Sequence, residues 1–363
     1  MARLGDYVRI RTGKLDANAS SENGQYPFFT CAVEPLRIDS YSYDCECVLV
    51  AGNGDLNVKY YNGKFDAYQR TYIIESLDKM ILSVPYLFCF LDKYVEKLRT
   101  LSIGGVIKYI KLGNLTEANI PLPNIQEQYT IVELCYKVNT LLSLRKQQLA
   151  KLDELVKSRF VKMFGTVKDN PYHFPTATLK EVCNKITDGK HGGCEQVADS
   201  GYYYVGAREI YDGEIHYDTA PQITYEDFAK DYRRCNIEQG DMVIVNTGAT
   251  IGKSAIASSP LTERTLLQKS VALIKVKTEV ISAEFLRYCY MANPSMYMVE
   301  SASAQPNLLL SKINATVIYL PPIELQEQFA TFVEQTDKSK SAVQQSIDQL
   351  ETLKKSLMQK YFG

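Results

Sequence analysis

An internal duplication constrains the fold of this chain more than any other feature of its sequence. Residues 121–129 and 321–329 share a proline and a Gln-Glu-Gln-aromatic run, at an offset of 200 positions. Further along, eight positions of 147–165 recur in 345–363 at an offset of 198, and both stretches end in Phe-Gly. Matches that extend along two such segments indicate two copies of one plan.

Each copy is expected to begin with a globular domain, at 1–120 and at 166–320. In both, short β-type runs alternate with turns rich in Gly, Asn and Asp, and short helical stretches intervene. We therefore predict two similar α+β domains, with strands at 48–50, 71–74, 242–245 and 271–276 and helices at 85–98 and 282–291.

The second part of each copy, 121–165 and 321–363, is predicted to be one long helix. Prolines stand at its start, and neither helix has Gly or Pro over nearly 40 residues. A narrow seam of alternating four- and three-residue steps is typical of a coiled coil. The seam comprises Val138, Leu142, Arg145, Leu149, Leu152, Val156, Arg159 and Met163, then Val343, Ile347, Leu350, Lys354, Leu357 and Tyr361. We expect an antiparallel pair of helices; the alternative is that each helix packs only on its own domain.

The overall composition excludes several classes of protein. The chain of 363 residues lacks an apolar run of about 18 residues, so we expect no membrane helix. Nine cysteines at irregular spacings favour free thiols in a reducing compartment, and the start MARLGDYVRIRTGK has no apolar core, so a cytoplasmic protein is expected. A formal charge of −1 gives no global sign of nucleic-acid binding.

Several motifs suggest catalysis but do not meet its spacing requirements. The run 247–254 (TGATIGKS) is similar to a phosphate-binding P-loop, but only three residues separate its two glycines instead of four. The run 169–172 (DNPY) is similar to the motif of adenine methyltransferases but lacks the second proline, and we interpret it as a linker turn.

Metal sites and nucleophilic sites are not predicted either. The three histidines are His173, His191 and His216, too few to support a Ser-His-Asp arrangement. His191 lies near Cys183 and Cys194, but that spacing does not match a zinc site. We therefore expect neither a metal nor a bound cofactor in this chain.

The order of a variable domain, an Ile-Pro-Leu-Pro-x-x-x-Glu-Gln-like segment and a long helix ending in Phe-Gly, twice over, resembles a known family. It is similar to the specificity (S) subunit of type I restriction–modification systems. Residues 120–128, 320–328 and the helix tails carry the resemblance.

The resemblance implies a subunit without catalytic activity that reads double-stranded DNA. Each front domain would be a target recognition domain for one half of a bipartite, asymmetric site. The paired helices would set the spacing between the halves and dock two methyltransferase (modification) subunits. Those subunits would bind S-adenosylmethionine and methylate adenine N6, and restriction subunits that use ATP can join such an assembly.

Given this resemblance, side-chain chemistry suggests which residues bind DNA and which dock the partner subunits or set the spacing. Arg and Gln make bidentate contacts to base edges, while Lys and Tyr suit phosphates. The DNA-binding candidates are Lys59, Tyr60, Asn62, Lys64, Gln69, Arg70, Tyr203, Arg208, Arg233, Arg234, Thr250, Lys253, Gln268 and Lys269. Gln69-Arg70-Thr71 and Gln268-Lys269-Ser270 are similar in sequence. Either both segments contact DNA, or both form the same structural turn. The candidates for docking and spacing are Gln126, Glu127, Gln128, Leu149, Leu152, Val156, Gln326, Glu327, Gln328, Ile347, Leu350 and Leu357.

Two alternatives remain open from the sequence. The first is a stand-alone adenine methyltransferase or nuclease with a recognition domain. The second is a coiled-coil scaffold with no role at DNA.

Overall fold

The computed structural model describes residues 1–166, 169–296 and 307–363, which form two compact units. Unit 1 contains residues 1–148 and 343–363, and unit 2 contains residues 149–342. The units therefore differ from the two sequence copies, because each takes one end of each long helix. The functional limits 1–120 and 166–320 stay predictions.

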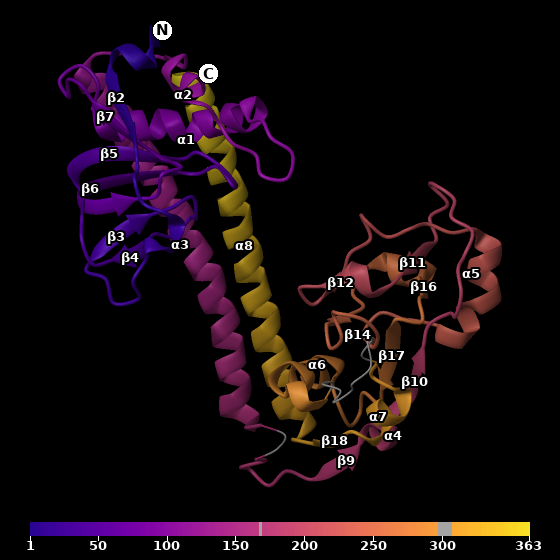
Figure 1. Ribbon diagram of the computed structural model, residues 1–363. Helices are drawn as coiled ribbons and strands as arrows, with labels where there is room; N and C mark the ends of the chain where they lie inside the picture. Colours follow the sequence, from indigo (N-terminus) through magenta and orange to yellow (C-terminus); the bar gives the residue numbers. More distant parts are fainter. Residues whose placement is uncertain (167–168, 297–306) are drawn as a thin grey trace. The chain divides into compact units, whose positions relative to one another are not determined.

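Unit 1 is built on a six-stranded sheet of order β2-β7-β5-β6-β3-β4, which is antiparallel except where β3 joins β6. Helix α1 lies along this sheet (Figure 1). The elements of the unit before its long helix are β1 (Ala2–Arg3), η1 (Leu4–Asp6), β2 (Val8–Thr12), η2 (Ala17–Ala19), β3 (Tyr26–Phe29), β4 (Leu36–Ile38), β5 (Tyr43–Ala51), β6 (Val58–Ala67), β7 (Thr71–Ser76), α1 (Val84–Leu101), α2 (Leu112–Thr116) and β8 (Asn119–Ile120).

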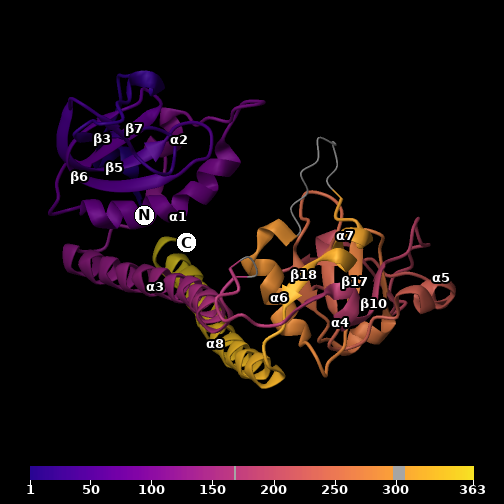
Figure 2. The ribbon, with the colours of Figure 1, turned by 90° about the horizontal axis from the view of Figure 1, so that it is seen from below.

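Unit 2 repeats the plan with a four-stranded antiparallel sheet of order β10-β17-β14-β15, beside which α6 and α7 lie (Figure 2). Its elements are β9 (Thr176–Thr178), α4 (Leu179–Val182), β10 (Cys183–Asp188), β11 (Tyr203–Val205), η3 (Ala207–Glu209), β12 (Ile210–Tyr211), β13 (Glu214–Ile215), α5 (Tyr225–Asp231), η4 (Tyr232–Cys235), β14 (Met242–Val245), β15 (Ser254–Ile256), η5 (Pro260–Arg264), β16 (Thr265–Leu267), β17 (Val271–Val276), α6 (Ala283–Ala292), η6 (Pro294–Met296), α7 (Leu310–Ala315) and β18 (Val317–Tyr319). The predicted strands and short helices, and the α+β class, are confirmed.

The long helices are α3 (Ile125–Phe164) and α8 (Ile323–Phe362), each of 40 residues and offset by 198 throughout. In unit 1 the start of α3 packs with the end of α8, where Ile131 and Met358 share one core. In unit 2 the end of α3 packs with the start of α8, where Phe160 and Phe329 have ring centroids 5.3 Å apart. The antiparallel pairing is confirmed.

The predicted seam is correct in its middle and at Val156, but near the helix ends the buried positions lie one residue after the predicted ones. Val138, Leu142, Val343 and Ile347 are buried, as predicted. Near the end of α3, however, Arg159 is exposed and Phe160 is buried instead. The reason is that the helix ends also pack into the globular cores, so their buried face is wider than a coiled-coil seam.

One buried glutamine anchors the start of each long helix. In unit 1 the Gln128 Oε1 atom accepts a hydrogen bond from the Ser83 N–H (2.9 Å), and its Nε2 atom donates to the carbonyls of Ile81 (2.7 Å) and Pro123 (3.0 Å). Ser83 is also the N-cap of α1, because its hydroxyl accepts from the Tyr86 N–H. The amide therefore joins α3 to the start of α1.

Gln326 makes the same bonds in unit 2. Its Oε1 atom accepts from the Ser282 N–H (2.9 Å), and its Nε2 atom donates to the carbonyls of Val280 (3.2 Å) and Pro321 (2.8 Å). The structural counterpart of Gln128 is thus Gln326 and not Gln328, which is exposed. The alignment of the two Gln-Glu-Gln runs at an offset of 200 is wrong by two positions. It matched the short motif with itself, whereas the two helices correspond at an offset of 198.

We predict that Gln128→Ala lowers the free energy of unfolding by on the order of 3 kcal/mol, because the buried Ser83 N–H and two partly buried carbonyls lose their hydrogen bonds to this side chain. Urea unfolding followed by circular dichroism measures this change. Gln126→Ala, at an exposed position two residues earlier, is the matched control and is expected to have a small effect. Equal midpoints for the two variants would refute the anchoring role.

Candidate nucleic-acid interface

Four of the eight predicted DNA-binding residues of unit 2 lie at one edge of its sheet, where β10 and β14 end and β15 and β17 begin; they are Thr250, Lys253, Gln268 and Lys269. Asn246, directly after β14, holds two segments there. Its N–H donates to the Ser270 carbonyl (3.0 Å), and its carbonyl accepts from the Leu308 N–H (2.7 Å). The turn between β14 and β15 therefore lies beside Gln268 and Lys269. We call this the turn edge of the unit.

Unit 1 has a turn edge built by the same bonds. The Gly52 N–H donates to the Arg70 carbonyl (2.7 Å), and the Gly52 carbonyl accepts from the Ile110 N–H (2.9 Å). The exposed side chains of Gln69 and Arg70 thus lie at this edge, next to the loop that leads from α1 to α2. Both predicted globular domains present the same edge, although their sequences there are unlike.

Equivalent backbone hydrogen bonds show that the predicted match between the two domains is wrong by one residue. The Gly13 N–H donates to the Thr71 carbonyl and the Gly189 N–H to the Val271 carbonyl, so Thr71 corresponds to Val271. Gln69 is therefore the counterpart of Lys269, and Gln268 occupies the position of Tyr68. What the two domains share is a structural turn rather than a pair of identical readers.

The unit 2 candidates at the turn edge have different surroundings. Lys253 and Lys269 are exposed, and Thr250 is half-buried. The Gln268 Nε2 atom donates to the Tyr204 carbonyl (3.3 Å), which ties the turn to β11. The two lysines are therefore the side chains best placed to meet a polyanion.

A second group of unit 1 candidates lies along β6, which begins at the turn edge, near Lys59, and runs away from it. The Lys64 ammonium lies 4.7 Å from the centroid of the Tyr41 ring, and Asn62 is exposed. The Tyr60 hydroxyl donates to Glu46 (2.8 Å), and burial together with this bond raises the pKa of Tyr60 to about 12. Lys59 is bonded to Asn57, and burial lowers the pKa of its ammonium.

The other unit 2 candidates are spread over several elements. Arg208 and Arg233 are exposed, and the Tyr203 ring packs edge-on against Tyr217. Arg234 forms an ion pair with Asp188 (2.7 Å). Burial raises the pKa of the Asp188 carboxyl, but hydrogen bonds from Arg234 and His191 outweigh it and leave that pKa below its usual value. Arg234 is thus held in place by a carboxylate.

Comparison with known proteins identifies the family. The family model described as type I restriction modification DNA specificity domain matches residues 1–154 and 172–352. The chain belongs to this family. A type I restriction enzyme EcoDI specificity subunit of Escherichia coli is 37% identical over 199 residues, which are 50% of this chain and 44% of that protein. The chain thus aligns with less than half the length of that relative.

Further similarities extend along the whole chain. A type I restriction enzyme MjaVIII specificity subunit of Methanocaldococcus jannaschii is 22% identical, covering 99% of this chain and 90% of that protein. The crystal structure of the S subunit from M. genitalium superposes with a TM-score of 0.66 at 18% identity, covering 100% of this chain and 95% of that one. These matches show a shared fold for the family.

The two motifs that suggested catalysis are structural turns in this family member. The 248–253 turn joins antiparallel strands β14 and β15, whereas a P-loop leads from a strand into a helix. Asn170 has a positive φ of 32°, and its side chain bonds both to the N–H and to the carbonyl of Phe174. Both therefore agree with the prediction of loops.

The predicted docking residues divide into buried and exposed sets. Gln128, Val156, Gln326 and Ile347 are buried in the described fold, and Leu149, Leu152, Leu350 and Leu357 are half-buried. Gln126, Glu127, Glu327 and Gln328 are exposed. The buried residues hold the helices rather than offering a surface to a partner.

An exposed apolar stripe on α3 was missed from the sequence. Tyr129, Tyr136, Leu141 and Leu144 are large apolar side chains exposed on the first part of this helix. Tyr129, Tyr136 and Leu144 are spaced by seven and eight residues, so they share one face. The signal was present in the sequence as a second apolar period beside the seam. This stripe is the better candidate for a docking surface.

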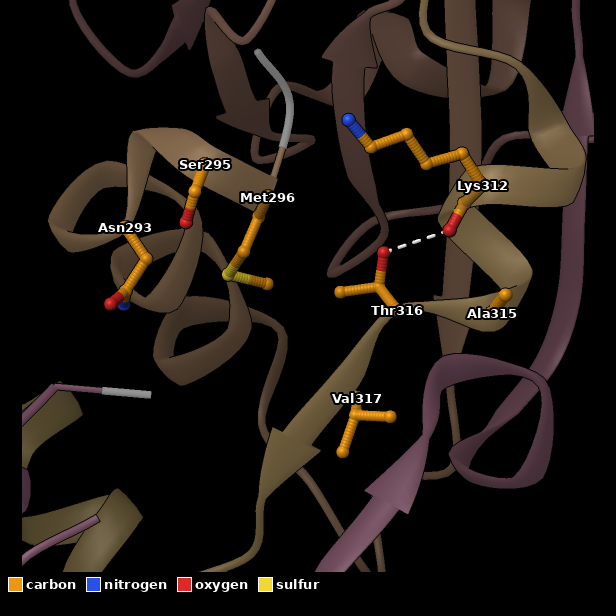
Figure 3. A pocket seen from close by; sticks show the side chains of 7 residues that line it. All are labelled: Asn293, Ser295, Met296, Lys312, Ala315, Thr316 and Val317. Atoms are coloured by element: carbon orange, nitrogen blue, oxygen red, sulfur yellow. Dashed lines mark hydrogen bonds between the residues drawn. The ribbon is translucent and has the colours of Figure 1, made fainter. Parts of the chain in front are cut away.

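Unit 2 also contains a hollow of about 360 Å³ between η6, α7 and β18 (Figure 3). It is lined by Asn293, Ser295, Met296, Lys312, Ala315, Thr316 and Val317, with one cation and no carboxylate. Across the described parts of the chain, no three His, Cys, Asp or Glu side chains gather as metal ligands, and all nine cysteines are free thiols. No described helix is long and apolar enough to span a membrane.

We predict that Gly189→Ala disrupts the turn edge of unit 2. A Cβ atom at Gly189 would lie 2.1 Å from the Leu267 carbonyl oxygen, so backbone must move, at a cost of about 1–3 kcal/mol. The control is Gly193→Ala, where a Cβ atom would meet no atom within 4 Å. Urea unfolding compares the two variants, and equal stability would show that the close approach is not needed.

Proposed function

We propose that this chain is the DNA sequence-specificity subunit of a type I restriction–modification system and has no catalytic activity of its own. The observation that carries the proposal is the duplicated turn edge, held by the bonds of Gly52 in unit 1 and of Asn246 in unit 2. Two similar domains with different side chains at equivalent edges suit two different half-sites of one bipartite target. Membership of the family supports the same role.

The charge distribution supports local rather than global contact with DNA. The chain as a whole carries a charge of −1, so long-range attraction from this subunit is weak. Exposed cations are nevertheless present at both turn edges, with Arg70 in unit 1 and with Lys253 and Lys269 in unit 2. Such residues position a duplex through its phosphates and read base edges where they reach a groove.

We further propose that two methyltransferase subunits dock on this chain. The exposed side chains of Tyr129, Tyr136 and Leu144 support this, because large apolar side chains that recur on one face of a helix suit a partner protein. S-adenosylmethionine would be bound by those subunits, which would methylate adenine, and restriction subunits would join the same assembly. The paired helices would set the spacing between half-sites.

A stand-alone methyltransferase is the principal competing function. The two proposals differ in where S-adenosylmethionine binds. Calorimetry with the isolated chain should show no binding, and binding should appear on addition of the methyltransferase subunit. Tight binding by the isolated chain would overturn the proposed role.

We predict that substitutions at each turn edge act on one half-site only. Gln69→Ala with Arg70→Ala should weaken binding at the half-site of domain 1 by about 10- to 100-fold, because base and phosphate contacts are lost. Lys269→Ala is the matched variant for domain 2. Binding of the assembled complex to duplexes with one half-site scrambled separates the two effects. Equal loss at both halves would indicate a folding defect.

We also predict that lengthening both helices changes only the spacer of the target. One heptad inserted within 138–163 and one within 336–361 adds about 10 Å of helix, or roughly three base pairs of duplex. Sequencing of methylated adenines in cells that contain the variant complex measures the outcome. An altered half-site with an unchanged spacer would contradict the role of the helices.

A further inference from the structure

The segment between α1 and α2 carries an exposed apolar tip that the proposed function has not yet used. Ile103 and Tyr109 pair across this segment through two hydrogen bonds, of 3.0 Å and 2.8 Å, which close a narrow loop at 103–109. We call 103–109 the Gly-Gly loop, after Gly104 and Gly105. At its tip Val106 is fully exposed and Ile107 is 62% exposed.

The base of the Gly-Gly loop is held firmly at the turn edge of unit 1. The Gly54 N–H donates to the Lys108 carbonyl (2.9 Å), and Ile110, directly after the loop, is buried and bonded to Gly52. Because Gly52 also bonds to Arg70, the loop is joined to the turn that carries Gln69 and Arg70. Figure 1 shows this segment leaving the end of α1 as an extended loop.

Two glycines leave the backbone bare beside the exposed tip of the loop. Gly104 has a φ of +115°, and a Cβ atom there would lie 2.4 Å from the Ile107 carbonyl oxygen. Gly105 has no atom near the position that a Cβ would take. Two adjacent glycines let another molecule approach the backbone closely, while the two apolar side chains point away from any core.

The charge around the Gly-Gly loop favours a polyanion as its partner. Residues 97–116 contain Lys97, Arg99, Lys108 and Lys111 and no Asp or Glu, although the domain as a whole (1–120) has 14 basic and 14 acidic residues. Arg99 is paired with Asp55 (3.3 Å), whereas Lys108 and Lys111 are exposed on either side of Tyr109. Apolar residues flanked by cations are the arrangement with which proteins enter a groove of duplex DNA.

We propose that the Gly-Gly loop inserts Val106 and Ile107 into a groove of the half-site read by domain 1, with Lys108 and Lys111 on the flanking phosphates. This inference rests on the proposed function and names the element that makes the apolar contact. The loop and the Gln69-Arg70 turn would then read one half-site together, because Gly52 fixes both.

The test compares two double variants. Val106→Ser with Ile107→Ser alters the tip of the loop, and Leu77→Ser with Met80→Ser is the control. Leu77 and Met80 are 63% and 73% exposed and follow the other end of β7, so they match the tip in exposure but not in position. Each variant is assembled with the methyltransferase subunits, and affinity is measured by fluorescence anisotropy on the target duplex and on duplexes with one half-site scrambled.

We expect the tip variant to lose affinity for the target by about 10- to 100-fold, with little change once half-site 1 is scrambled. The control pair should match the wild type. Unchanged selectivity of the tip variant would overturn the inference. Loss of the methyltransferase subunits from a folded tip variant, seen by size-exclusion chromatography, would overturn it in favour of a protein partner.

The experiment also separates this inference from the proposed function. A wild-type complex that selects no sequence would refute the specificity role and the loop inference together. A selective wild type with an equally selective tip variant would refute only the role of the loop. Should the double variant unfold, Ile107→Ser alone provides the same comparison.

Discussion

The architecture of both units depends on one buried amide at the start of each long helix. Gln128 and Gln326 are wholly buried, and each accepts a hydrogen bond from a backbone N–H and donates to two carbonyls. Through these bonds a 40-residue helix is joined to the start of α1 or α6, which packs on the sheet. The position of each sheet relative to its own part of the helix pair follows from this contact.

Aromatic residues at the ends of the long helices also pack against α1 and α6. Phe362 at the end of α8 lies 5.2 Å from Tyr86 of α1, between ring centroids, and Phe164 at the end of α3 lies 4.9 Å from Phe285 of α6. The end of each helix is thus part of the core formed with the start of the other. The antiparallel pair is a component of both cores, so neither unit is complete without both helices.

The turn edges show how the two domains of this chain keep one backbone arrangement with different side chains. The bonds that Gly52 and Asn246 make to Arg70, Ile110, Ser270 and Leu308 join backbone atoms, so they do not fix which side chains those positions carry. Unit 1 places Arg70 where unit 2 places Ser270, and Tyr68 where unit 2 places Gln268. A fixed backbone with variable side chains suits the proposed reading of two different half-sites.

By itself, the sequence determined the duplication, the α+β class and the extent of the helices, because periodic apolar patterns and repeats are local properties of a chain. It also determined the register of the helix tails, at the offset of 198 that the structure confirms, but not that of the helix starts or of the turns, because the Gln-Glu-Gln runs and the Gln-basic turns match two residues and one residue away from their structural positions. Only the tertiary structure placed Ile110, Arg70 and Gly52 together, because those contacts join residues far apart in sequence through backbone hydrogen bonds that leave no pattern in the side chains. The exposure of Val106 and of the Tyr129 stripe was likewise decided by what does not pack against them in the fold.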